Sequence, residues 1–172
     1  MTFEVSISVA NKTEATALAA LRTAVAQGMA QQFGDGPWAK APTRAEVGRQ
    51  LRASRVLVAR QGDEVMGTVR LVTALPGVID THAFTPVGKA FYVLGLAVAP
   101  GCRGRGIGSQ LMEAAKDTAR SRGAQALWLD AYDHAAGAGL FYMKCGFRQV
   151  GRTNYREVPL LWFEWLVAES PR

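Results

Sequence analysis

Hydrophobic positions in the first part of the chain follow a strand pattern and then a helix pattern. Apolar and polar side chains alternate from Phe3 to Val9, which predicts a half-buried strand. Apolar residues then recur every three or four positions, which predicts a helix whose buried stripe is Leu18, Leu21, Val25, Met29 and Phe33. The segment G-D-G-P-W ends this helix. A capping box of Thr43 and Glu46 predicts the start of a second helix, which runs through Leu51.

The middle of the chain predicts a hairpin, a loop and a buried strand. Two runs rich in β-forming residues, Val56 to Arg60 and Val65 to Thr73, flank the turn signal Q-G-D-E. The segment from Ala74 to Lys89 holds two prolines and two glycines, which indicates a long surface loop of a kind that is often functional. The continuously apolar run from Phe91 to Val98 predicts a strand buried on both faces.

A helical pattern resumes at Ile107 and ends at Gly123, a typical C-cap residue. Its predicted buried face is Ile107, Leu111, Ala115 and Ala119, and its predicted water-facing residues are Gln110, Glu113, Lys116, Asp117 and Arg120. Further strands are predicted at Leu127 to Ala131, Phe147 to Val150 and Leu160 to Val167, with a short helix between Ala135 and Lys144. No repeat or linker interrupts these elements, so we expect one mixed α/β domain over residues 1–172.

The composition excludes several classes of protein. With 49% hydrophobic and 20% charged residues, the 172-residue chain resembles an ordinary globular domain rather than a disordered one. Two cysteines, Cys102 and Cys145, and two histidines argue against a disulfide framework or a zinc cluster, so no metal is expected. The sequence has no signal-peptide pattern and no apolar run of the ~18 residues that span a bilayer. We therefore expect a soluble cytoplasmic protein that has no membrane partner.

The formal net charge of +6, from 20 basic and 14 acidic residues, favours an anionic partner. The basic residues are dispersed, and no Lys/Arg block interleaves with aromatic residues, which argues against nucleic acid as that partner. A polyanionic small ligand accounts for the charge equally well.

A candidate anion site lies between the buried strand and the helix that begins at Ile107. The segment V-A-P-G-C-R-G-R-G-I-G-S-Q-L, from Val98 to Leu111, places glycines and two arginines directly before the helix start. Glycines allow close approach of an anion, the first helical N–H groups point at it, and arginines add bidentate donors. The spacing matches neither the dinucleotide motif G-x-G-x-x-G nor a P-loop, since Ile107 follows Gly106. A plain tight turn is the alternative, although a turn does not require this many glycines and arginines.

The motif R-x-x-G-x-G, here Arg103, Gly106 and Gly108, lies within the longer string L-A-V-A-P-x-x-R-G-x-G-I-G-x-x-L that starts at Leu96. This string resembles the cofactor-binding motif of the GNAT superfamily of acyl-coenzyme A-dependent N-acetyltransferases. The segment A-G-L-F-Y-M-K-C-G-F that ends at Phe147 resembles a later helix of that family with its tyrosine. The resemblance implies a mixed, mostly antiparallel central sheet of about six to seven strands with helices on both faces.

The resemblance also implies an activity, the transfer of an acetyl group from acetyl-CoA to a primary amine that attacks the thioester directly. The implied coenzyme-binding residues are Leu96, Ala97, Val98, Arg103, Gly104, Arg105, Gly106, Ile107, Gly108 and Ser109. The turn would bind the phosphates, and the strand end would pair with the pantetheine amides and supply an N–H for the oxyanion. Tyr142 occupies the position of the tyrosine that protonates the coenzyme sulfur, and its alternative role is a core aromatic beside Phe141 and Phe147.

Two positions depart from the family pattern. Ala135 stands where an asparagine is usual, and Tyr92 stands where many members have an acidic base. The general base therefore stays open among Tyr92, His82, Asp130, His134 and a chain of waters. Each of these side chains also has a structural interpretation, and Asp133 is expected to cap a helix start.

Several further expectations concern the end of the chain and the alternatives to an enzyme. Cys145 is expected to be a small buried residue, and the segment L-L-W-F-E-W-L-V is expected to be core, although its two apolar faces could serve a homodimer.

No motif assigns the acceptor, a small molecule or a protein amine, or the length of the acyl group. A non-catalytic acyl-CoA-binding sensor or interaction module is the main alternative, and a nucleic-acid-binding domain is a weaker one.

Overall fold

The computed structural model describes residues 4–73, 80–155 and 157–168, and the chain divides into two compact units. The first unit comprises Met1–Leu71 with Leu94–Ala115, and the second comprises Val72–Val93 with Lys116–Arg172. By sequence, strand β4 (Ala90–Val98) and helix α3 (Ile107–Ser121) each begin in one unit and continue into the other. The expectation of a single domain over residues 1–172 stays a prediction.

Hydrogen bonds order the seven described strands as β1-β2-β3-β4-β5-β7-β6. Besides β4, their bounds are β1 Ser6–Val9, β2 Arg55–Gln61, β3 Glu64–Val72, β5 Ala126–Tyr132, β6 Arg148–Tyr155 and β7 Val158–Leu166. β4 and β5 pair in parallel at Ala90, Phe91 and Tyr92. The pairs β1/β2, β2/β3, β5/β7 and β6/β7 are antiparallel. The predicted mixed, mostly antiparallel sheet is therefore confirmed.

In the first unit, α1 (Ala15–Phe33) and α2 (Arg44–Ala53) pack on the β2–β3 hairpin, each of them preceded by a short 3-10 turn, η1 (Lys12–Glu14) and η2 (Pro37–Ala39). Side chains from both helices and from β2 form one buried cluster, made of Leu18, Val47, Val56 and Val58. The predicted capping box begins α2. Thr43 Oγ1 accepts from Glu46 N at 3.2 Å, and the Glu46 carboxylate accepts from Thr43 N at 2.7 Å. Both helices and the hairpin are therefore confirmed.

The start of α3 lies on the opposite face of β3, in the same unit. Thr68 lines a cavity with Leu18 of α1, so its neighbour Gly67 faces the other way along the strand. A Cβ on Gly67 would lie 3.0 Å from Ala97 O, 3.0 Å from Leu111 Cδ1 and 3.2 Å from Ile107 Cγ2. The absence of a side chain on Gly67 thus lets the helix approach the strand closely. Helices cover both faces of the sheet in this unit, as predicted.

Helix α3 confirms its predicted buried face, since Ile107, Leu111, Ala115 and Ala119 are all at most 1% exposed. It also ends at Gly123 as predicted, with a φ of 68° and a Schellman pair of bonds from Ala124 N to Ala119 O and from Gly123 N to Arg120 O.

Lys116, by contrast, does not face water as expected, because it is only 6% exposed. Its Nζ donates to Cys145 O at 2.5 Å and lies 5.3 Å from the centre of the Trp165 ring. The prediction was wrong because the period of one helix does not show which acceptors other elements bring to a buried ammonium.

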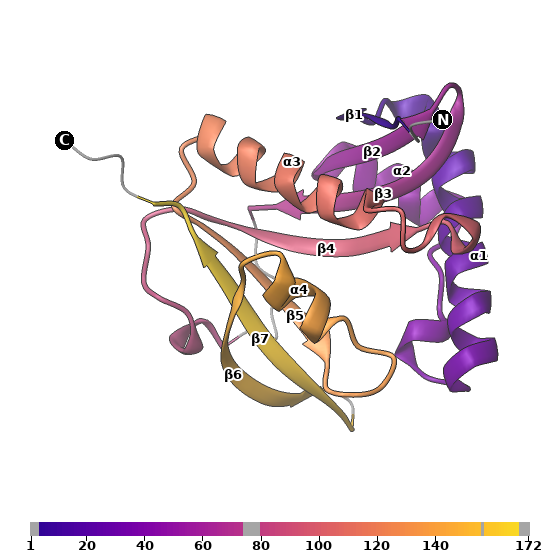
Figure 1. Ribbon diagram of the computed structural model, residues 1–172. Helices are drawn as coiled ribbons and strands as arrows, with labels where there is room; N and C mark the ends of the chain where they lie inside the picture. The colour runs from indigo at the N-terminus through magenta and orange to yellow at the C-terminus, as the bar shows by residue number, and fades with distance from the viewer. Residues whose placement is uncertain (1–3, 74–79, 156, 169–172) are drawn as a thin grey trace. The chain divides into compact units, whose positions relative to one another are not determined.

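In the second unit, α4 (Gly139–Lys144) is shorter than the predicted helical span (Figure 1). The preceding chain turns too tightly for a helix, since a Cβ on Gly137 would lie 1.8 Å from Tyr132 O. Ala138 stands at the N-cap without a capping side chain. The prediction that Asp133 caps a helix was therefore wrong: Asp133 pairs with Arg152 at 2.5 Å, because β6 runs past it.

The rest of the second unit is an aromatic core. Phe84 stacks on Trp128 at 4.6 Å and on Trp162 at 5.7 Å, and Phe163 of β7 is fully buried. Leu160, Trp162 and Phe163 of the C-terminal aromatic segment are thus core, as predicted, whereas Leu166 near its end is 39% exposed. The described part of the long loop includes a 3-10 turn, η3 (Thr81–Ala83), and residues 74–79 of the loop lie outside the described residues.

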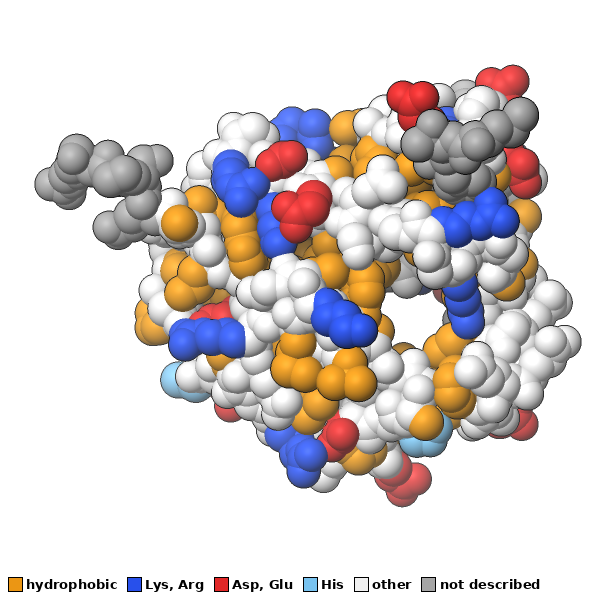
Figure 2. Space-filling model, in the orientation of Figure 1, with side chains coloured by type: hydrophobic (Ala, Val, Ile, Leu, Met, Phe, Trp, Pro, Cys, Tyr) orange, Lys and Arg blue, Asp and Glu red, His pale blue; other side chains and the backbone are white. Residues whose placement is uncertain are grey.

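On the face that Figure 2 shows, basic side chains stand singly among acidic and apolar ones, in keeping with the dispersed charge of the sequence. None of the described helices is long and apolar enough to cross a membrane.

Candidate active site

The segment that we call the glycine-arginine turn, residues 101–106, joins β4 to α3 in the first unit. It overlaps a 3-10 turn, η4 (Pro100–Cys102), and ends where α3 starts at Ile107. Gly104 and Gly106 have φ values of 76° and 78°, a region that residues with a Cβ rarely adopt. A Cβ built on either glycine would have nothing within 4 Å, so the backbone there borders open space. The glycines are thus required by the conformation, and they leave the main chain accessible.

The start of α3 supplies main-chain donors beside this turn. The first bond that closes the helix runs from Gln110 N to Gly106 O at 3.0 Å. The N–H groups of Ile107, Gly108 and Ser109 come before it, where a helix has no carbonyl partners of its own and where its dipole is positive. Ile107 is 1% exposed, so the first turn is anchored in the core. This arrangement fits a phosphate group.

Three further side chains belong to the turn. Arg103 and Arg105 are exposed, and Arg103 Nη2 lies 3.7 Å from Met29 Sδ of α1. Cys102 is half-buried, and its Sγ donates to Met66 Sδ of β3 at 3.4 Å. Open backbone, helix-start amides and two arginines on one short segment are the donor set that a pyrophosphate requires.

The predicted pantetheine-binding residues Leu96, Ala97 and Val98 form the end of β4 in the same unit. Gly95 directly before them has a φ of 61°, which interrupts the regular strand. Ala99 N donates to Met66 O at 2.8 Å, so β3 holds this end of β4 in place. The structure therefore brings all ten predicted coenzyme-binding residues together within the first unit.

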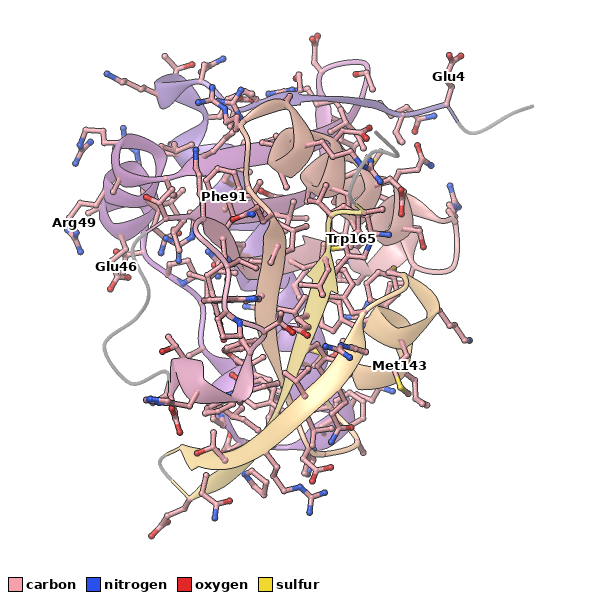
Figure 3. All side chains as sticks on the ribbon, turned by 90° about the vertical axis from the view of Figure 1, so that its left-hand side faces the viewer. Glu4, Glu46, Arg49, Phe91, Met143 and Trp165 are labelled. Carbon is pink, nitrogen blue, oxygen red and sulfur yellow. The ribbon has the colours of Figure 1, made fainter. Side chains whose placement is uncertain are left out.

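Tyr142 lies in α4 of the second unit and is 8% exposed. Its ring contacts Phe141, Phe147 and Phe163 at centroid distances of 5.3, 6.0 and 6.1 Å. The packing role is therefore observed, and the proton-donor role stays a prediction. The neighbouring Met143 projects outward from the helix (Figure 3) and is 46% exposed, so Tyr142 lies on the inner side of α4.

Asp130 of β5 and Tyr92 of β4 form a hydrogen-bonded pair in the second unit, in which the Tyr92 hydroxyl donates to Asp130 Oδ2. Burial raises the pKa of the Asp130 carboxyl, and the hydrogen bond from Tyr92 opposes part of that rise. Burial and then the Asp130 charge raise the pKa values of Tyr92 and Tyr142, so both phenols keep their protons. We call Tyr92, Asp130 and Tyr142 the tyrosine-aspartate cluster.

The cluster narrows the choice of general base. A phenol with a raised pKa is a poor base, which disfavours Tyr92, whereas a carboxylate with a raised pKa accepts a proton more readily than an exposed one. His82 is exposed and lies 2.8 Å from Asp80 through Nδ1, and exposed His134 accepts from Ala136 N at 3.0 Å. Both histidines thus make local turn contacts. Ala135 is also exposed.

The sequence interpretation missed three positively charged side chains that the fold buries fully or in part. Lys116 is one, and Arg22 of α1 and Arg70 of β3 are the others, both half-buried. A signal was present for Arg22, which follows Leu18 by one helical turn and so lies within the predicted apolar stripe. The signal for Arg70 was weaker: it is a basic residue inside a run of strand-forming residues.

Comparisons with known proteins agree on one family. The model of the acetyltransferase (GNAT) family matches residues 23–147. Streptothricin acetyltransferase of Streptomyces lavendulae is 48% identical over 56 residues, which make up 33% of this chain and 30% of that protein.

Two solved structures resemble this chain in fold. A GNAT-family acetyltransferase of Streptococcus pneumoniae is 18% identical with a TM-score of 0.72, and the alignment covers 96% of this chain and 100% of that one. An aminoglycoside 6′-N-acetyltransferase in complex with coenzyme A is 18% identical with a TM-score of 0.68, over 97% of this chain and 99% of that one. At such identities the two structures show that the fold is shared.

Proposed function

Because the chain belongs to the acetyltransferase (GNAT) family, we propose that it transfers an acetyl group from acetyl-CoA to a primary amine. The observation that carries the proposal is the glycine-arginine turn, in which Gly104 and Gly106 adopt left-handed conformations beside open space at the start of α3. In the proposal, the N–H groups of Ile107 to Ser109 and the guanidinium groups of Arg103 and Arg105 bind the coenzyme phosphates. No metal takes part.

The thioester is proposed to lie along the end of β4. Leu96 to Val98 would pair with the amides of the pantetheine arm as a neighbouring strand does. A main-chain N–H of this segment would donate to the thioester oxygen as negative charge develops on it. The positive φ of Gly95 supports this role, because it interrupts the regular strand directly before the segment.

The tyrosine-aspartate cluster is proposed to handle the protons. Asp130 takes a proton from the acceptor ammonium, directly or through water, and the free amine attacks the thioester carbon. The C–S bond breaks as the C–N bond forms, and Tyr142 protonates the departing thiolate. The nitrogen then loses its second proton, which returns to Tyr142 through water. The raised pKa of Tyr142 favours a phenol that is protonated when the thiolate leaves.

The test is release of free thiol from acetyl-CoA, followed over a panel of primary amines, together with calorimetry of coenzyme binding. We expect micromolar or tighter binding of acetyl-CoA and thiol release with at least one class of amine. Binding without release on any class would favour the non-catalytic acyl-CoA module instead. Binding of DNA or RNA that weakens steeply with salt, without coenzyme affinity, would favour a nucleic-acid-binding domain.

A further inference from the structure

A cation lies on the buried side of α1 in the first unit. Arg22 follows Leu18 by four residues and precedes Ala26 by four, and both neighbours are at most 5% exposed. Its side chain therefore lies on the face that packs against the sheet. Arg22 Nη1 donates to Gln50 Oε1 of α2 at 3.0 Å, which fixes the guanidinium but leaves its charge uncompensated, because an amide is neutral.

A second cation reaches the same place from β3. Arg70 lies two residues after Thr68 and so on the same face of the strand. Thr68 Oγ1 donates to Leu57 O at 2.9 Å, whereas Arg70 Nε is buried and has no hydrogen-bond partner. Together with Arg22, Arg70 lines a cavity whose other residues are Leu18, Val47, Gln50, Val56, Thr68 and Gly95. We call it the arginine cavity.

The charge of the arginine cavity is unbalanced. Burial lowers the pKa of both guanidinium groups, and Arg70 lowers that of Arg22 further, which means that the two charges repel each other at short range. Within residues 4–73, 80–155 and 157–168, neither arginine forms an ion pair with a carboxylate. Desolvated like charges without a counter-ion are costly for a fold, so they mark a place where an anion would be strongly favoured.

The arginine cavity borders the residue next to the proposed thioester segment. A Cβ on Gly95 would lie 3.1 Å from Arg22 Nη2, so the guanidinium packs on the strand where the side chain is missing. Gly95 directly precedes Leu96, at which the proposed pantetheine contacts begin. An anion beside Arg22 would thus lie one residue along β4 from the reacting end of the donor.

We propose that Arg22 and Arg70 bind a carboxylate of the acceptor, so that the substrate is a small molecule carrying both a primary amine and a carboxylate. This inference rests on the proposed acetyl transfer and names its acceptor class. The cavity holds only about 10 Å³, about one water, so the carboxylate would lie at its mouth against the two half-buried arginines. A planar carboxylate matches the guanidinium fork, and the same two charges repel polycationic amines.

The test compares amines in matched pairs. Amino acids with the amine at increasing distance from the carboxylate, from glycine and alanine through β-alanine to 6-aminohexanoate, are each assayed beside their amides, with spermidine as a polycation. Phosphoethanolamine is assayed beside β-alanine to separate phosphate from carboxylate. We expect at least one acid to have a kcat/KM about tenfold or more above that of its amide, and spermidine to be poor.

Two variants assign the effect to the arginine cavity. Arg22→Gln and Arg70→Gln should each raise KM for the preferred acid by about tenfold and abolish its advantage over the amide, with KM for acetyl-CoA unchanged. Arg22→Lys and Arg70→Lys keep the positive charge and should retain part of the preference for the acid. They provide a second test if a glutamine variant fails to fold. Arg49→Gln is the matched control, because this α2 arginine is exposed and projects away from the molecule (Figure 3).

The outcomes separate the inference from the function it rests on. Four results would overturn the carboxylate assignment while acetyl transfer stands. They are equal kcat/KM for acids and amides, a preference for spermidine, a preference for phosphoethanolamine over β-alanine, and retention of the acid preference in both glutamine variants. Acetyl-CoA binding with no turnover of any amine overturns the proposed function itself. In that case calorimetry on the coenzyme-loaded protein still tests whether the arginine cavity binds the acids. Absence of such binding would contradict the carboxylate assignment.

Discussion

The glycine-arginine turn and the tyrosine-aspartate cluster differ in which part of the chain forms the site, the main chain in the turn and buried side chains in the cluster. The turn is made of main chain: its positive φ values and helix-start amides set the geometry, while Arg103 and Arg105 are exposed. The cluster is made of buried side chains whose pKa values the surroundings shift. Coenzyme binding at the turn should therefore be lost when a side chain is added to a glycine, whereas catalysis by the cluster should depend on individual hydroxyl and carboxyl groups and on pH.

The largest effect is expected at the turn. Gly106→Glu would add a carboxylate in the open space beside the phosphate donors and would strain a φ of 78°, so affinity for coenzyme A should fall more than about 100-fold. Calorimetry measures this. Gly62→Glu is the control, since Gly62 also has a positive φ and an open surrounding but lies in the β2–β3 turn. Equal losses in both variants would mean that strain, not the anion site, is responsible.

The next effect tests the cluster. Tyr142→Phe removes one hydroxyl and keeps the ring contacts with Phe147 and Phe163, so kcat should fall by about 100-fold while the Kd for coenzyme A stays the same. Steady-state kinetics with the best amine and calorimetry give the two numbers. Unchanged kcat would leave Tyr142 as a packing residue only.

A third experiment asks how the turn is held in position. Gly67→Val places methyl groups where Ala97 O and Leu111 already lie 3.0 Å from the Cβ position, and should destabilise the protein by about 1–3 kcal/mol. Gly48→Ala in α2 is the matched control, with Arg52 Nη1 at 3.7 Å as its nearest neighbour, and should stabilise by about 0.5–1 kcal/mol. Urea unfolding measures both. The same sign for both would contradict the close packing of α3 on β3.

The smallest effect concerns pH. Tyr92 lowers the pKa of Asp130 through its hydrogen bond, so Tyr92→Phe should raise that pKa further. Activity that needs the Asp130 carboxylate is lost as pH falls through its pKa, and the acid limb of the kcat/KM profile should therefore move to higher pH. Asp130→Asn should remove that limb. An acid limb that stays in place in both variants would exclude Asp130 as the base.

The sequence was most informative where the chain contacts itself locally. The capping box at Thr43, the cap at Gly123 and the turn before Ile107 each depend on neighbours within a few residues, and each was predicted at its observed position. These features require glycine or a capping side chain at fixed positions, and few other residues can replace them.

The misses that concern charged side chains depend on distant partners. Lys116 is buried because Cys145 O, far along the chain, accepts a hydrogen bond from its Nζ. Asp133 does not cap a helix because it pairs with Arg152 of β6. The arginine cavity joins Arg22 and Arg70 from elements that no local pattern connects. Side-chain sites of this kind need the topology before their members can be identified.

Cys102 gives the glycine-arginine turn a chemical reporter of its own. The chain has two cysteines, and Cys145 is buried whereas Cys102 is half-buried and directly precedes Arg103. A maleimide should therefore label Cys102 first, and a thiol next to the proposed phosphate donors should be shielded when coenzyme A is present. The labelling rate of Cys102, measured at increasing coenzyme concentration, would then give the fraction of protein with coenzyme bound in the absence of any acceptor. Coenzyme binding can thus be studied separately from acceptor binding.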